Sequence, residues 1–153
     1  MTIQPLTLHR DHLTLEDIDL HDPYITTNLE IFAFHNILLR NLTSCHTHSA
    51  TLATSNFEPF LIYTRFTIRV LTAYLHSTDT IWFPAYAQYD PRFHDLIDAH
   101  KPLRAAATEL ADLLAAAEPV TLGSLLGEVE GRLGKLRAAV GPQFEEARFM
   151  PEF

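Results

Sequence analysis

The sequence predicts an all-α fold, an antiparallel up-down four-helix bundle that follows an N-terminal arm. Four long segments carry apolar residues at intervals of three and four, which is the pattern of amphipathic helices. Short connections join these segments, as in antiparallel bundles, and no segment alternates apolar and polar residues over the length of a strand. With 153 residues the chain can bury a single core. We expect the arm at residues 1–23 and the bundle, as one domain, at residues 24–153.

The first two helices are predicted before the middle of the chain. The first runs from about Ile25 to Thr47, and a polar connector follows it. The second runs from Phe57 to Thr80 and stops just after it, because the sequence Ile-Trp-Phe-Pro leads into Pro84. Proline disfavours a helical backbone at the residue before it.

The last two helices each contain an internal proline. The third is predicted from Arg92 to Ala117, with a kink or a fresh start at Pro102. The fourth is predicted from Thr121 to about Phe149, with a kink at Pro142.

Composition and charge exclude several classes of function. The formal net charge is −8, and the 11 basic residues are scattered, so nucleic acid is not an expected partner. No apolar run approaches the roughly 18 residues of a membrane span, and the first residues carry charges where a signal peptide would be apolar. The single cysteine, Cys45, excludes an internal disulfide. We therefore expect a cytoplasmic protein that binds neither membranes nor nucleic acid.

Polar residues within the apolar stripes mark a candidate site. His35 on the first helix and Tyr74 on the second are predicted to point at the core, and so are His100 and Arg104, which lie one turn apart on the third. A buried guanidinium needs a partner, and Glu145 on the fourth helix is the candidate. His76 falls instead on the solvent face of the second helix.

Two motifs carry a resemblance to a known family. An acidic residue, a His-Asn pair and an arginine occur in that order as Glu30, His35-Asn36 and Arg40, and the second helix ends in Trp82-Phe83-Pro84. From about Ile25 to Phe149 the chain resembles the hemerythrin-like (HHE cation-binding) domains, especially the branch common in filamentous fungi. The resemblance implies a four-helix bundle whose interior holds a two-metal centre.

The sequence departs from this family at the metal ligands. The family's histidine and glutamate on the second helix fall on Tyr74 and Thr78, and the second histidine of the third helix falls on Arg104. A two-iron centre needs several imidazoles and bridging carboxylates, and a fixed positive charge repels it. We therefore predict no metal and no cofactor. If a metal is retained, its ligands would be the three matching residues, His35, His100 and Glu145.

The function predicted from these residues is acid/base chemistry on a small organic molecule, without metal. Cyclisation, dehydration or isomerisation would fit, in a cyclase, lyase or isomerase, and the fungal branch suggests secondary metabolism by analogy. The predicted catalytic residues are His35, Tyr74, His100, Arg104 and Glu145, and the predicted substrate contacts are Phe32, Asn36, Tyr63, Val70, Thr78, Trp82 and Ile97.

Two alternatives remain open from the sequence. The protein would handle oxygen or iron if His35, His100 and Glu145, with His76 or Asp79, held iron or another divalent metal. It would be a non-catalytic interaction module if the surface of the bundle bound a partner chain and the interior were filled, with the imidazoles bonded only to their neighbours. In that case Arg104 would form a structural ion pair, and Tyr74 would be a core aromatic.

Overall fold

The computed structural model of the protein describes residues 21 and 23–146, without the side chains of residues 23–30, 32 and 143–146. Four long helices dominate this part of the chain: α1 (Pro23–Ser49), α2 (Phe57–Ser77), α4 (Arg92–Ala116) and α5 (Leu122–Glu146). Shorter helical elements are η1 (Thr54–Asn56), η2 (Thr78–Trp82) and α3 (Phe83–Tyr86). The described residues contain no strand, so the prediction of an all-helical fold is confirmed. The predicted arm lies outside the described residues, apart from His21 and Pro23.

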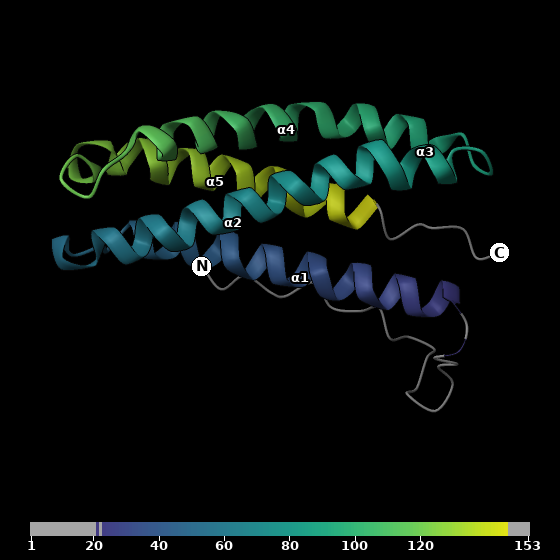
Figure 1. Ribbon diagram of the computed structural model, residues 1–153, viewed down its shortest axis with the longest axis horizontal. Coiled ribbons are helices and arrows are strands. Elements are labelled where there is room, and N and C mark those ends of the chain that lie inside the picture. Colours follow the sequence, from purple (N-terminus) through teal and green to yellow (C-terminus); the bar gives the residue numbers. More distant parts are fainter. Residues whose placement is uncertain (1–20, 22, 147–153) are drawn as a thin grey trace.

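The four long helices lie side by side (Figure 1). Each contacts two neighbours: α1 packs on α2 and α5, and α4 packs on α2 and α5. The start of α1, the end of α2 and the start of α4 lie at the same end of the molecule (Figure 1). No helix in the described ranges is both long and apolar enough to cross a bilayer.

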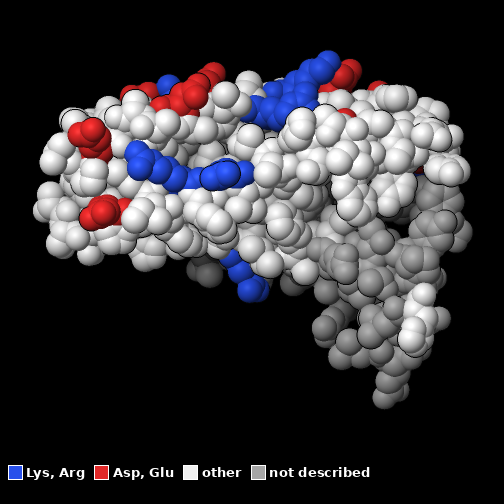
Figure 2. Space-filling model, in the orientation of Figure 1, with Lys and Arg blue, Asp and Glu red and all other residues white. Residues whose placement is uncertain are grey.

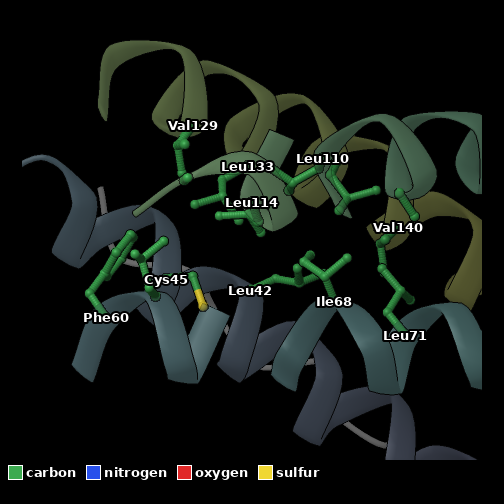
Figure 3. Packing of buried hydrophobic residues seen from close by; sticks show 14 of the residues in the cluster. Leu42, Cys45, Phe60, Ile68, Leu71, Leu110, Leu114, Val129, Leu133 and Val140 are labelled. Atoms are coloured by element: carbon green, nitrogen blue, oxygen red, sulfur yellow. The ribbon is translucent and has the colours of Figure 1, made fainter. Parts of the chain in front are cut away.

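The core is built mostly from leucines. Their side chains meet between the helices, and Figure 3 shows residues from all four long helices pointing toward one another. Burying a leucine contributes about 1.5–3 kcal/mol, so this cluster is the main source of stability. Its fully buried members include Leu38, Leu42, Leu71, Leu75, Leu110, Leu114, Leu122, Leu133 and Leu136.

The inward face of α2 differs from the prediction by about one residue. Tyr63 was expected to face the core, but it is 41% exposed, and Phe66 on the next turn is 63% exposed. The tyrosine hydroxyl donates to Asn41 Oδ1 on α1 (2.9 Å), at the surface. A shift of one residue rotates a helix by about 100°, and this moves Tyr63 from the core to the edge. The buried residues of α2 are Phe57, Phe60, Leu61, Thr64, Thr67, Ile68, Leu71 and Leu75.

The chain does not leave helical geometry at Pro84 as predicted. It passes from α2 through a π-helical turn, η2, directly into α3, where the proline lies in the first turn. The backbone N–H of Phe83 donates to the carbonyl of Thr78, five residues earlier. Pro84 has no N–H to donate, so the ladder of hydrogen bonds changes just before it. The wider turn tolerates the proline instead of ending the helix.

Pro102 and Pro142 lie inside α4 and α5, and both helices run through them. Proline removes one backbone hydrogen bond in each case but does not divide either helix into two. The predicted fresh start at Pro102 is therefore wrong.

Candidate functional site

His35 and Tyr74 form an inward-facing pair between α1 and α2. The imidazole is 2% exposed, and its Nε2 shares a hydrogen bond with the hydroxyl of the half-buried phenol. The two rings meet edge to face, and the Phe34 ring packs against the tyrosine with centroids 4.9 Å apart. Burial raises the pKa of Tyr74 to about 12, partly offset by a hydrogen bond with Thr78. The phenol therefore keeps its proton at neutral pH.

Asp79, His100 and Arg104 form a second cluster between η2 and α4. His100 Nδ1 lies 2.7 Å from Asp79 Oδ1, and the side chains of both residues are 4% exposed. Arg104 forms an ion pair with the other carboxylate oxygen, Oδ2. The guanidinium is partly exposed, whereas the carboxylate and the imidazole are buried.

The charge state of this cluster follows from its burial. Desolvation lowers the pKa of His100 to about 4, so the imidazole is neutral at pH 7. Arg104 already balances the charge of Asp79, and a second positive charge would be buried without compensation. A neutral imidazole beside a carboxylate donates its Nδ1–H to Asp79, and Nε2 then carries the lone pair. This arrangement presents His100 as a proton acceptor.

An aromatic group covers His100. The Phe83 ring lies 5.3 Å from the imidazole centroid and 5.4 Å from the ring of Phe93. Tyr86 stacks on Phe93 with centroids 5.3 Å apart. These rings come from α3 and the start of α4, so the turn that follows Asp79 also screens the imidazole from water.

Thr78 connects the two clusters along the chain. It lies one turn after Tyr74 and directly before Asp79, and its hydroxyl donates to the Tyr74 carbonyl (2.8 Å). Threonine is buried here, as is its acidic neighbour.

The predicted site residues meet as two groups. His35 joins Tyr74, and His100 joins Arg104 through Asp79. Arg104 was expected to pair with Glu145, but its partner in the structure is Asp79. The side chains of Glu145 and Phe32 lie outside the described residues.

The predicted substrate contacts are divided between core and surface. Thr78 is buried, and Asn36, Val70 and Ile97 are half-buried. Trp82 is 43% exposed and lies against Tyr86, at the surface rather than in the core. The surface position of Tyr63 removes it from this group as well.

Sequence reasoning gave Asp79 too little weight. It considered this residue only as a possible metal ligand, because a helix of 3.6 residues per turn aligns Thr78 rather than Asp79 with Tyr74. The π-helical turn at Thr78–Trp82 cannot be predicted from a count of 3.6 residues per turn. The signal in the sequence was an acidic residue five positions after Tyr74 and five before Pro84.

The described residues do not fit the two-metal centre that the family resemblance implies. The positions of two expected ligands hold Thr78, whose hydroxyl is bonded to the backbone, and Arg104, whose charge opposes a cation. Both oxygens of Asp79 are engaged by His100 and Arg104. Within the described part of the chain, no three His, Cys, Asp or Glu residues come together as metal ligands.

Fold and site together define an all-helical protein with a buried imidazole–carboxylate–guanidinium cluster and an inward-facing imidazole–phenol pair. The chain is similar to the xanthocillin biosynthesis cluster protein F of Aspergillus fumigatus, with 36% identity over 148 residues. The match covers 95% of this chain and 65% of that relative, so the chain spans slightly less than two thirds of the relative's length. No family model and no solved structure matches the chain.

Proposed function

We propose that this protein takes part in fungal secondary metabolism, in the cytoplasm. The similarity to a protein of a xanthocillin biosynthesis cluster supports this proposal. We further propose that the four long helices form an up-down bundle of the hemerythrin-like kind, in which the metal centre has been replaced by polar side chains. The bundle would bind a small organic molecule at the end that carries His35 and His100.

The proposed chemistry is acid/base catalysis without a metal, of the cyclase, isomerase or lyase type. The observation that carries it is the buried hydrogen bond of His100 to Asp79, with Arg104 on the second carboxylate oxygen. A bundle needing only stability would fill these positions with apolar side chains, since buried charged groups rarely contribute net stability. An oriented, neutral imidazole is in contrast what a general base requires.

In this proposal His100 accepts a proton at Nε2 from the substrate. Asp79 holds the ring through Nδ1 in the tautomer that leaves Nε2 open to a proton, and Arg104 positions the carboxylate. Arg104 is thus a positioning residue rather than an anchor for the substrate.

The phenol of Tyr74 has the complementary role. With a pKa of about 12 it remains protonated, so its hydroxyl can donate a hydrogen bond to an oxygen that gains negative charge. His35 contacts this hydroxyl and orients it. Thr78, Asn36, Val70 and Ile97 are the remaining residues proposed to contact the substrate.

The proposal is tested by gene replacement in the source organism, with metabolite profiling by mass spectrometry. Strains carrying His100→Gln or Tyr74→Phe should give the profile of a deletion strain. Two exposed residues of the same types, His94 and Tyr89, provide matched controls. His94→Gln and Tyr89→Phe should retain the parental profile.

The proposal is wrong if His100→Gln and Tyr74→Phe both retain the parental profile. Circular dichroism of the purified variants establishes that they are folded. Elemental analysis of protein purified without chelators tests the metal-free part, because stoichiometric iron, zinc or manganese would favour the metal-binding alternative.

A further inference from the structure

A groove on the outer surface runs between α2 and α4. It has a volume of about 630 Å³, within the size range of small-molecule sites. Its lining includes Arg65, Arg69 and His76, together with the apolar Ile68, Ala73 and Leu114. We refer to it as the α2–α4 groove.

The groove lies on the opposite side of α2 from the pair formed by His35 and Tyr74. Arg65, Arg69 and His76 are exposed, as the sequence predicted for this face. His76 follows Tyr74 by two residues, which corresponds to about 200° around the helix axis. The groove is therefore separate from the site of the proposed function and does not depend on it.

The charge of the groove is opposite to that of the chain as a whole. The net charge is −8, yet none of the groove's lining residues is acidic and two are arginines. Figure 2 shows basic side chains along the boundary between α2 and α4. This local inversion favours a ligand with negative charge.

The two arginines differ in what they already contact. The Arg65 guanidinium donates to the carbonyl of Leu114 (2.7 and 2.9 Å) and to that of Ala117, so it caps the C-terminal end of α4. Within the described residues, Arg69 has no ion pair. The positive charge available to a ligand is therefore that of Arg69.

The apolar part of the groove extends along α2. From Arg69 to His76 the helix rises about 10 Å, at 1.5 Å per residue. An elongated hydrocarbon or aromatic body can lie along this length on the small apolar side chains of Ala73, Ala111 and Ala115, and remove them from water. Arginine binds carboxylates in a bidentate manner. We propose that the α2–α4 groove binds an elongated apolar carboxylate, with its charged group at Arg69.

The test is a titration of the full chain with decanoate, followed by amide chemical shifts in NMR and by calorimetry. Decyltrimethylammonium, with the same chain length and the opposite charge, is the ligand control. Decanoate should shift the amides of Thr72, Ala73, Ala111 and Ala115, which line the groove. Decyltrimethylammonium should leave them in place.

Two variants test the charge and the shape separately. Arg69→Glu should weaken decanoate binding by roughly tenfold or more, since a charge-assisted contact is replaced by repulsion. Ala73→Phe should weaken it by filling the groove while keeping Arg69. Arg40→Glu, at an exposed position on α1, should bind like the parent.

Circular dichroism of each variant confirms that it is folded. The proposal is overturned if decanoate shifts other regions of the protein, if decyltrimethylammonium binds equally well, or if Arg69→Glu has no effect on affinity.

Discussion

The two ends of the helical structure differ in what they bury. Around Leu42, Leu114 and Leu133 the helices meet through aliphatic side chains, and the cluster seen in Figure 3 is almost entirely hydrocarbon. Near the middle of α1 and where α2 ends, the chain buries His35, Asp79 and His100. The first region accounts for the stability of the fold. The second adds groups whose desolvation opposes folding unless they are fully paired.

This difference separates residues retained for packing from residues that need another explanation. Aliphatic side chains would fill the polar end at no electrostatic cost, as they do elsewhere between these helices. The paired oxygens of Asp79 and the hydrogen bond between His35 and Tyr74 limit that cost. Polar groups arranged in this way are typical of sites that handle protons.

The largest expected effect is in the aliphatic region. Leu133→Ala removes a fully buried side chain and should lower the free energy of unfolding by about 2–5 kcal/mol. Ile62→Ala, at a position that is 61% exposed, should change it by less than about 0.5 kcal/mol. Urea denaturation followed by circular dichroism measures both. Equal losses for the two variants would contradict the description of the core.

Removing Asp79 should have the next largest effect. Asp79→Ala leaves His100 and Arg104 without their shared partner, and we expect a loss of about 2–3 kcal/mol, reduced because the guanidinium is partly exposed. Chemical denaturation gives the value. In the double variant Asp79→Ala/Arg104→Met, the loss should be smaller than the sum of the two single losses. Additive losses would show that the ion pair is not formed.

The pH dependence of stability should show the environment of His100. The pKa is about 6.5 in the unfolded chain and about 4 in the folded protein, so the unfolded state binds more protons between these values. The contribution of neutral His100 to the free energy of unfolding is complete above about pH 6.5, and it is lost as the pH falls toward 4. From pH 7 to pH 5 the loss due to this residue should be about 2 kcal/mol.

The measurement compares the parent with His100→Gln. Thermal or urea unfolding of both at pH 7 and pH 5 isolates the contribution of this residue from that of the other eight histidines. The parent should lose more stability than the variant between the two pH values. A parent that loses less would mean that Asp79 raises the pKa of His100 instead.

The smallest expected effect is an optical one at Tyr74. Burial raises its pKa from 10 to about 12, so this phenol should ionise late in an alkaline titration followed by ultraviolet absorbance. Tyr74→Phe should remove this late transition. Exposed Tyr89 provides the control, since Tyr89→Phe should leave the late transition in place. If Tyr74→Phe left the late transition in place, the Tyr74 side chain would be exposed to water rather than buried.

The helices could be predicted because their apolar periodicity is strong. The expected bounds of α2 and α4 agree with the structure to within a few residues, and His35 and His100 were correctly placed in the core. The partner of Arg104 could not be predicted in the same way. It depends on the π turn before Pro84, which changes the register of α2 just where Asp79 occurs.

The exposed position of Tyr63 is a second feature that the sequence could not predict. Its stripe on α2 is apolar and aromatic, but the neighbouring stripe around the helix is apolar too and contains Leu61, Ile68 and Leu71. A helix with apolar residues on most of its circumference leaves its rotation open until its neighbours are placed. Phe66 and Tyr63 are exposed for that reason, although both are aromatic.

The most direct test of the account is nitrogen NMR of the His100 imidazole at pH 7, with His100→Gln to assign its signals. A neutral ring that donates to Asp79 should show a protonated Nδ1 and an unprotonated Nε2. The account is contradicted if both nitrogens are protonated, or if the proton is on Nε2 and Nδ1 is bare.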